Sequence, residues 1–348
     1  MKKRIAINGF GRIGRLFFRQ IAGNSKIEVV AINDLGDATN LAYLLRHDSV
    51  YRNWPEEIKI EGSSSTNLGT KGNFLIVNGK KIVMLQEKEA AKLPWKDLKI
   101  DLVVESTGAF ESFEKAEAHL KAGAKKVVIT APAKDEEGTA GGRTVLMGVN
   151  DEKLKTCRLS SNGSCTTNAT APVVAVLAEK LGIKKAVLNT IHAYTATQLI
   201  TDGPVRGKDF LRGRAGAQNI IPSTTGAAIA TTRVVPELAG KFDGVAMRVP
   251  VVAGSAADIT FLASRKTTVE EVNSILKKAA REKRWKGILN VSEEPLTSSD
   301  IIREPYAAIV DASFTKVVDG DLVKVLSWYD NEWGYVATLI RHVEQALK

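Results

Sequence analysis

The chain has 348 residues, of which 44% are hydrophobic and 25% are charged. These are ordinary globular proportions, which exclude a disordered chain, a collagen and a coiled coil and fit roughly two domains of ~150 residues. The 49 Lys and Arg outnumber the 39 Asp and Glu, so the formal net charge is +10. That excess favours anionic partners without choosing among phosphorylated metabolites, nucleotides, nucleic acid and an acidic membrane surface.

The apolar runs and the cysteines bear on where the protein works. The basic start Met1–Arg4 is followed by an apolar stretch that is too short and too glycine-broken for a signal peptide. No run of ~18 apolar residues occurs, so no membrane span is expected. Cys157 and Cys165 are too few for a disulfide framework or a cysteine-rich metal site. We therefore expect a cytoplasmic protein without a membrane partner or a resident metal.

The N-terminal region has the order of a dinucleotide-binding unit. In chain order it predicts a strand over 4–8, the turn Gly9-Phe10-Gly11-Arg12-Ile13-Gly14, a helix over 15–21, a strand over 27–32 and then Asp34. The acid lies 34 − 14 = 20 residues past the last glycine. Strand, G-x-G-x-x-G, helix, strand and acid at this spacing predict a Rossmann βαβ unit.

Each residue of that pattern has a physical task. Gly9 permits the tight turn, Gly11 lets the backbone approach a pyrophosphate, and Gly14 lets the helix pack closely on the strand. The helix N-terminus presents N–H groups to the phosphates. Asp34 can accept hydrogen bonds from a ribose and would repel a 2′-phosphate, which favours NAD over NADP. A bare G-x-G-x-x-G is often an ordinary loop, so the prediction depends on the surrounding elements.

Strands and helices continue to alternate through the first half. The sequence predicts a helix capped by Asp37, a hairpin over 74–84 with an Asn-Gly turn, strands over 102–105 and 127–130, and a helix over 112–122. The polar stretch 62–69 is typical of a solvated loop. This alternation predicts a doubly wound parallel sheet. The turns 106–108 and 130–132 follow strand ends, where such sheets bind ligands, although plain loops would fit them equally well.

The polar stretch around Cys165 is the strongest candidate for chemistry. Helical spacing over 171–181 places Cys165 at or near a helix N-terminus, and Pro172 is expected to kink that helix or mark its start. The helix dipole and unpaired N–H groups favour thiolate, so we expect the thiol pKa to fall below about 8.5. A lone cysteine is more often a small buried hydrophobe, which is our interpretation of Cys157.

A thiol nucleophile needs a base, and four histidines are available. His192 ends an apolar strand-like run at the expected edge of a site, so it is our candidate. His47 follows a helix, and a role in capping that helix is enough to explain it. His119 and His342 lie on helices, with nothing that places them at the edge of a site. Without the cysteine, His192 would be interpreted as an ordinary core histidine.

These residues resemble those of one family, the phosphorylating, NAD-dependent glyceraldehyde-3-phosphate dehydrogenases. The similar stretches run along the whole chain in the family's order: Ile7–Arg15, Ser161–Asn168, His192–Gln198, Ile220–Ala228, Met247–Pro250 and Trp328–Tyr335. The resemblance implies oxidation of D-glyceraldehyde 3-phosphate to 1,3-bisphosphoglycerate in glycolysis or gluconeogenesis, by a homotetramer. It also implies a thioester intermediate.

The resemblance carries roles over to matching positions of this chain. It implies that Cys165 attacks the aldehyde and that His192 takes the thiol proton and assists hydride departure. It implies a substrate and phosphate site of Ser164, Thr166, Thr195, Arg212, Thr225, Gly226 and Arg248. It implies NAD contacts at Gly9, Gly11, Arg12, Ile13, Gly14, Asp34, Lys88, Thr130 and Asn331, with Lys88 standing where the family often has arginine.

The second half is predicted to form an α+β catalytic domain with a mostly mixed or antiparallel sheet. Strands are expected over 186–193, 245–249, 257–262, 307–313 and 322–328, and a helix from Thr267 toward Arg284. The resemblance implies that the last helix returns to the first domain. The predicted domains are therefore 1–164 with 329–348 for NAD binding and 165–328 for catalysis.

Two other functions compete with this one. Erythrose-4-phosphate dehydrogenase is a relative that hydrolyses its thioacyl enzyme, and the run Thr195–Gln198 argues against it. A nucleic-acid-binding protein would use the charge of +10, but no compact basic run, zinc signature or aromatic RNA platform occurs.

Overall fold

The structure, a computed structural model, describes residues 2–63, 72–205, 207 and 209–348. The chain divides into two compact units. Unit 1 comprises Met1–Val145, Asp151–Gly163 and Leu339–Lys348, and unit 2 comprises Leu146–Asn150 and Ser164–Thr338. Most of the predicted loop over 62–69 lies outside the described residues. None of the helices in the described parts of the chain is long and apolar enough to cross a bilayer.

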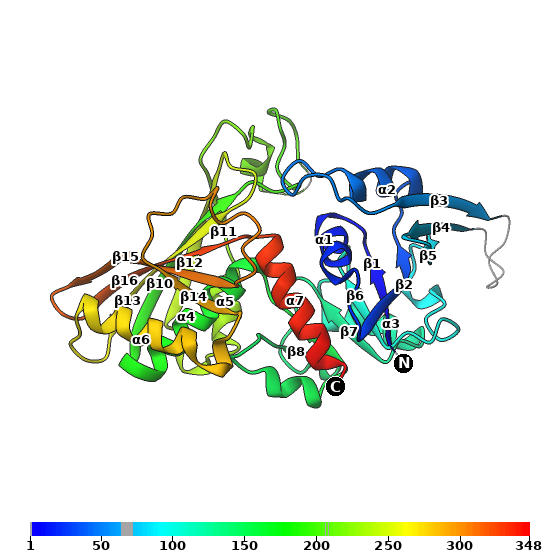
Figure 1. The fold of residues 1–348 in the computed structure, drawn as a ribbon. Coiled ribbons are helices and arrows are strands. Elements are labelled where there is room, and N and C mark those ends of the chain that lie inside the picture. Colours follow the sequence, from blue (N-terminus) through cyan, green and yellow to red (C-terminus); the bar gives the residue numbers. More distant parts are fainter. Residues whose placement is uncertain (1, 64–71, 206, 208) are drawn as a thin grey trace. The chain divides into compact units, whose positions relative to one another are not determined.

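Unit 1 is built on one sheet with the strand order β3-β4-β5-β2-β1-β6-β7-β9-β8 (Figure 1). The strands are β1 (Lys3–Asn8), β2 (Ile27–Asn33), β3 (Ile58–Ser63), β4 (Gly72–Val77), β5 (Lys80–Leu85), β6 (Leu102–Glu105), β7 (Lys126–Ile129), β8 (Arg143–Thr144) and β9 (Leu159–Ser161). All neighbouring pairs are parallel except β3–β4 and β4–β5, the latter being the predicted hairpin. The predicted parallel sheet and hairpin are therefore confirmed.

Successive residues of a strand point to opposite faces of the sheet, and the central strands carry apolar residues on both faces. Helices therefore cover both faces. Its helices are α1 (Arg12–Ile21), α2 (Ala38–Arg46) and α3 (Phe113–Lys121), with short 3₁₀ turns at Ala90–Lys92, Thr139–Gly141 and Asp151–Lys155. On β1, Ala6 belongs to the apolar cluster that includes Phe113 of α3. The next residue, Ile7, points to the other face, where its side chain lies close to Gly14 of α1. This doubly wound arrangement confirms the predicted fold class.

Unit 2 has a second sheet with the order β11-β12-β10-β13-β16-β15-β14. Its strands are β10 (Ile183–Ala193), β11 (Ile221–Thr224), β12 (Phe242–Val249), β13 (Ser255–Ala263), β14 (Leu289–Ser292), β15 (Ala308–Val318) and β16 (Leu322–Tyr329). The pairs β10–β12 and β14–β15 are parallel, and the others are antiparallel. The predicted mixed sheet is confirmed, while β11 and β14 are short strands that the sequence did not reveal.

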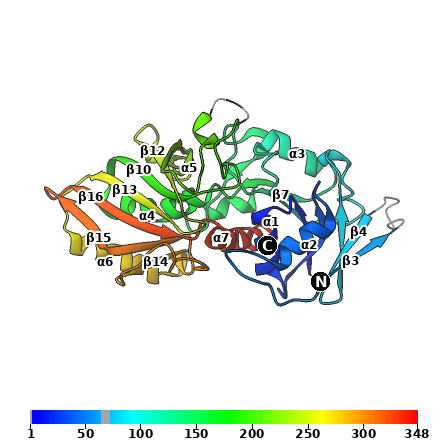
Figure 2. The same cartoon turned by 90° about the horizontal axis from the view of Figure 1, so that it is seen from above.

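One face of the second sheet is covered by helices. These are α4 (Cys165–Leu181), α5 (Ala227–Thr232) and α6 (Val269–Arg281), and 3₁₀ turns occur at Phe210–Gly213, Pro236–Leu238 and Lys283–Trp285. Figure 2 shows α4 running along the sheet and α6 beside β14 and β15, with which it packs. Most of α4 is apolar and buried, as expected of a helix enclosed on all sides. It continues through Pro172, so that proline does not mark the helix start.

The last helix, α7 (Trp333–Ala346), belongs to both units, because residues from Leu339 onward are part of unit 1. There the buried His342 contacts the Ser160 hydroxyl through Nε2 at 2.8 Å and Asn162 Oδ1 through Nδ1 at 3.1 Å. Residues 329–338 fall in unit 2, whereas the predicted boundary put 329–348 with the first domain. As a division into NAD-binding and catalytic domains, the predicted boundaries remain a prediction.

Burial lowers the pKa of His342 to about 3 from the ordinary 6.5, so the native ring stays neutral where the unfolded chain binds a proton. The stability that this ring contributes is therefore complete above about pH 6.5 and is lost as the pH falls toward about 3. We expect the difference in free energy of unfolding between wild type and His342→Gln to narrow as the pH is lowered through this window. Urea titrations at several pH values measure that difference, and a constant difference would contradict the prediction.

Candidate active site

The first turn of α4 is shaped by a reciprocal pair of hydrogen bonds. Ser164 is the N-cap, and its Oγ accepts from the Thr167 N–H at 3.0 Å. In return, Thr167 Oγ1 accepts from the Ser164 N–H at 3.3 Å. Such a capping box fixes where a helix begins. Cys165 is consequently the first residue of α4, as the sequence predicted.

Strand pairing brings three candidate residues together around this thiol. His192, near the end of β10, pairs in register with Arg248 of the neighbouring parallel strand β12. Nε2 of His192 lies 3.4 Å from Sγ of Cys165, and Nη1 of Arg248 lies 2.5 Å from Nδ1 of the same ring. The imidazole of His192 therefore contacts the thiol of Cys165 on one side and the guanidinium of Arg248 on the other, and all three lie in unit 2. The geometry is that of a nucleophile with an adjacent base.

Nδ1 of His192 has two neighbours that require opposite tautomers. The carbonyl oxygen of Ala193, at 2.6 Å, would accept a proton carried by Nδ1. The guanidinium of Arg248 would instead donate to a lone pair there. Only the tautomer selected by Ala193 leaves a lone pair on Nε2 facing Cys165. An anion that draws the Arg248 side chain toward itself favours the tautomer in which His192 can act as a base.

Burial governs the protonation of the pair. It raises the pKa of the Cys165 thiol, although Arg248 and hydrogen bonds from Thr166 act in the opposite direction. It also lowers the pKa of His192 to about 3, with the nearby Arg248 lowering it further. The predicted fall in the thiol pKa is therefore wrong, because the cost of burying the charge exceeds the effect of the helix N-terminus. Burial therefore favours the neutral form of both the thiol and the imidazole.

Tyr329 is a member of this cluster that the sequence analysis missed. Its buried hydroxyl lies 2.9 Å from Thr166 Oγ1 and 2.8 Å from Thr190 Oγ1. Its ring meets that of His192 edge to face, with centroids 6.0 Å apart. Burial raises the pKa of the phenol, so it stays protonated. The motif Trp328–Tyr335 contains Tyr329. The sequence does not reveal that the Tyr329 hydroxyl meets Thr166 and Thr190, which belong to other elements.

The candidate anion-binding residues are only partly brought together. Thr195 and Thr197 hydroxyls lie 3.2 Å apart, and Arg212 Nη1 donates to Thr197 Oγ1 at 2.7 Å. Arg212 is also one of the charges that lower the pKa of Arg248, after burial. Two guanidiniums close enough for Arg212 to act on Arg248 are suited to share an anion. In the described parts of the chain, no hydrogen bond joins Thr225 or Gly226, just before α5, to Cys165.

The glycine turn of unit 1 fits a dinucleotide. Gly9 has a φ of +94°, and a Cβ there would lie 2.6 Å from backbone atoms of Ser106 and Thr107. A Cβ on Gly14 would lie 2.2 Å from the Gly9 carbonyl oxygen, so the helix packs against the turn. A Cβ on Gly11 would meet only open space. Because α1 also has no side-chain cap, its N-terminus has room for a pyrophosphate.

The acid at the end of β2 is tied to that turn. Asp34 Oδ2 accepts from the Phe10 N–H at 2.6 Å, and Oδ1 accepts from the Gly36 N–H at 2.8 Å. Asp34 is half-buried, and each oxygen retains a second lone pair for a ribose hydroxyl. Arg12 and Ile13 begin α1, where Arg12 forms an ion pair with Asp48 at 3.2 Å. These residues therefore fit the adenosine side of NAD.

The remaining cofactor candidates are less constrained. Lys88 is exposed after β5, and Thr130 is half-buried just after β7, with its N–H donated to the Glu105 carbonyl. Asn331 lies in unit 2, where its Oδ1 accepts from the Gly254 N–H and the Ser255 hydroxyl. Its carbonyl oxygen is thus occupied, so any bond to a nicotinamide amide would come from Nδ2. Their contacts with NAD remain predictions.

Comparison with known proteins assigns both halves of the chain to one family. Residues 3–113 match "Glyceraldehyde 3-phosphate dehydrogenase, NAD binding domain", and residues 164–331 match the C-terminal domain of the same family. Three similar curated proteins are all named glyceraldehyde-3-phosphate dehydrogenase. They come from Mycolicibacterium smegmatis (46% identity, 100% of both chains), Streptomyces coelicolor (47%, 98% of this chain and 97% of the relative) and Mycobacterium tuberculosis (47%, 98% and 97%).

The charge of Arg248 lowers the pKa of the Cys165 thiol, so removing it should move thiolate formation to higher pH. We expect Arg248→Gln to shift the midpoint of the pH–rate profile for Cys165 alkylation by iodoacetamide upward. Arg265→Gln is the matched control, because it removes one positive charge from an exposed pair with Glu271 in the same unit. A midpoint that stays in place or moves to lower pH in Arg248→Gln would contradict the assigned electrostatics.

Proposed function

The chain belongs to the glyceraldehyde-3-phosphate dehydrogenase family and is an NAD-dependent oxidoreductase of glycolysis, and on that premise we propose that Cys165 and His192 carry its reaction. D-glyceraldehyde 3-phosphate, inorganic phosphate and NAD⁺ give 1,3-bisphosphoglycerate, NADH and a proton. The observation that supports these two roles is the 3.4 Å separation of thiol and imidazole at the start of a capped helix.

The first step forms a bond between sulfur and the aldehyde carbon. Because burial favours the neutral form of both groups, Cys165 attacks as its proton moves to Nε2 of His192. The proton then passes to the former carbonyl oxygen, which gives a hemithioacetal. The Ala193 carbonyl holds the proton on Nδ1 and stabilises the transient imidazolium. Thr195, Arg212 and Arg248 would hold the phosphate of the substrate and so position its aldehyde.

The second step oxidises the hemithioacetal to a thioester. Nε2 of His192 removes the hydroxyl proton as the hydrogen on carbon departs with its electron pair. The glycine turn and Asp34 would hold NAD, which when bound supplies the acceptor for that hydride. Inorganic phosphate then attacks the thioester carbon, and the thiolate of Cys165 leaves. Ser164, Thr166, Thr225 and Gly226 are proposed to hold this phosphate.

Removal of the nucleophile or the base tests these roles. Cys165→Ser should abolish phosphate-dependent NADH formation, because serine at this site is a far weaker nucleophile. His192→Asn should lower kcat by about 100- to 10,000-fold, as expected for loss of a general base. Initial rates at 340 nm, with and without inorganic phosphate, measure both effects. Full activity in Cys165→Ser would refute the proposal.

Erythrose-4-phosphate dehydrogenase remains a second candidate that no contact in the structure favours. A thioacyl enzyme cleaved by phosphate needs inorganic phosphate for turnover, whereas one cleaved by water does not. Comparison of kcat/KM for the two aldehydes, each with and without phosphate, separates the candidates. We expect glyceraldehyde 3-phosphate to be preferred and the rate to depend on phosphate.

We also propose that the chain forms a homotetramer. The face of the second sheet opposite α4 carries Val187 and Val245, which are 60% and 48% exposed. On the same face Asn189 pairs in register with Asp258, and each has a buried oxygen without a partner in the described parts of the chain. Further large apolar side chains are exposed in the segment after β10: Ile200, Phe210, Leu211 and Ile220. Such surfaces are typical of oligomer interfaces.

A charge placed on this face should disrupt assembly. Wild type should have a mass about four times the 37.6 kDa of one chain by light scattering, and Val245→Glu a smaller mass, because its carboxylate would be buried. Lys286→Gln, an equal change in charge on an exposed loop residue, should leave the mass unchanged. A monomeric wild type would contradict the proposal.

We propose as well that the protein is located in the cytoplasm. Cys165 and Cys157 are both free, and a nucleophilic thiol requires a reducing compartment to stay so.

A further inference from the structure

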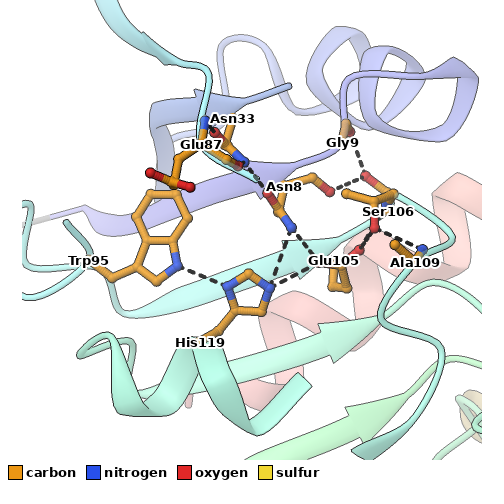
Figure 3. A network of polar contacts seen from close by, with 10 residues as sticks. Asn8, Gly9, Asn33, Glu87, Trp95, Glu105, Ser106, Ala109 and His119 are labelled. Atoms are coloured by element: carbon orange, nitrogen blue, oxygen red, sulfur yellow. Dashed lines mark hydrogen bonds and ion pairs between the residues drawn. The ribbon is translucent and has the colours of Figure 1, made fainter. Parts of the chain in front are cut away.

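A buried carboxylate lies at the carboxyl edge of the first sheet, apart from the reacting groups. Glu105 ends β6, and its side chain is 1% exposed. Oε2 accepts from Asn8 Nδ2 at 2.5 Å and from His119 Nε2 at 2.9 Å (Figure 3). Oε1 accepts from the backbone N–H of Thr107 at 2.8 Å and from its hydroxyl at 2.5 Å. Each oxygen of this carboxylate therefore has two hydrogen-bond donors.

The neighbours of His119 fix the protonation of this network. The indole N–H of Trp95 donates to Nδ1 of His119 at 3.0 Å, so Nδ1 carries no proton (Figure 3). Nε2 must then carry the proton that it donates to Glu105, and the ring is neutral. Glu105 therefore accepts from the neutral His119 ring at Oε2 and from Thr107 at Oε1. No Lys or Arg forms an ion pair with it in the parts of the chain that the structure describes.

The network reaches three strand ends that surround the proposed NAD site. Asn8 Oδ1 accepts from Asn33 Nδ2 at 2.7 Å, and the two asparagines directly precede Gly9 and Asp34 (Figure 3). Glu105 directly precedes the turn 106–108. This turn follows a strand end, where doubly wound sheets bind ligands, but the proposed function gives it no role. One carboxylate is therefore connected to the glycine turn, to the acid and to this third turn.

The turn at 106–108 packs directly on the glycine turn. Ser106 Oγ donates to the Gly9 carbonyl at 2.7 Å, and the Ser106 N–H donates to the Asn8 carbonyl at 2.7 Å. The space that a Cβ on Gly9 would need is filled by the backbone of Ser106 and Thr107. A shift of Thr107 therefore displaces Gly9. Glu105 holds Thr107 by two bonds and so sets the geometry of both turns.

We propose that Glu105 and His119 are positioning residues for NAD: the buried carboxylate holds the ends of β1, β2 and β6 in the arrangement that binds the dinucleotide. The inference rests on the proposed function only in placing NAD at the glycine turn and Asp34. Stability alone is a weak reason for this carboxylate, since well-packed apolar residues often replace buried charges without loss of stability. A buried carboxyl group with four hydrogen bonds instead fixes one arrangement of the elements that are bonded to it.

Glu105→Gln tests the proposal with almost no change in shape. A glutamine has one acceptor oxygen and one NH₂ group, so in either orientation the NH₂ faces donors. We expect the Kd for NAD, measured by calorimetry without substrate, to rise about ten-fold. The kcat at saturating NAD should stay within about two-fold of wild type, because the bound cofactor restores the geometry. The rate of Cys165 alkylation without NAD should not change.

His342→Gln is the matched control, because it removes a buried histidine from another polar network of unit 1. It should lower the unfolding midpoint and leave the Kd for NAD at the wild-type value. A second pair of variants covers the case in which Glu105→Gln does not fold. His119→Phe removes the N–H donated to Glu105 and should weaken NAD binding, and His119→Gln, which keeps a donor and an acceptor, should restore part of it.

Two results would overturn the proposal. One is a wild-type Kd for NAD in Glu105→Gln or, where that variant does not fold, in His119→Phe. The other is an equal rise in Kd in His342→Gln, which would make the effect a general consequence of destabilisation. Failure of the proposed function would be seen differently, as absence of phosphate-dependent NADH formation by the wild-type protein.

Discussion

The candidate active site depends on one constraint: burial makes a negative charge on the Cys165 sulfur costly. Burial opposes thiolate at Cys165 and imidazolium at His192, so it favours an uncharged pair. In the proposed mechanism a neutral pair needs close contact to exchange a proton, and the capping box of α4 together with the end of β10 provides that contact. Among the largest influences on the pKa of the Cys165 thiol, the charge that favours thiolate is that of Arg248.

In the proposed function, Arg248 would link anion binding to proton transfer. Its guanidinium lies against Nδ1 of His192, where it competes with the Ala193 carbonyl. A phosphate that attracts the guanidinium removes this competition and leaves Nε2 as the basic atom. The register of β10 with β12 makes the link possible, because it places Arg248 directly beside His192. In the proposed mechanism, substrate recognition and activation of the base would therefore involve the same side chain.

Features set by neighbouring residues were predictable from the sequence. The glycine turn, the Asn-Gly hairpin and the start of α4 each depend on a few adjacent positions, and the structure has them where expected. The direction of the pKa shift at Cys165 was not predictable, because burial depends on strands far along the chain. The same applies to His119 and Tyr329, whose partners come from other elements. The short strands β11 and β14 carry too few residues for a clear pattern.

The division of α7 between the two units has a consequence for the order in which the protein folds. Ser160 and Asn162 of unit 1 acquire their histidine partner from a residue that lies about 180 positions later in the chain. On the ribosome, all of unit 2 up to Thr338 is made before that partner exists. Until then, buried polar groups of β9 and the loop after it lack the bonds that satisfy them in the finished fold. The segments of unit 1 that precede unit 2 are completed only by residues that follow it, so the folding of unit 1 waits until unit 2 has been made.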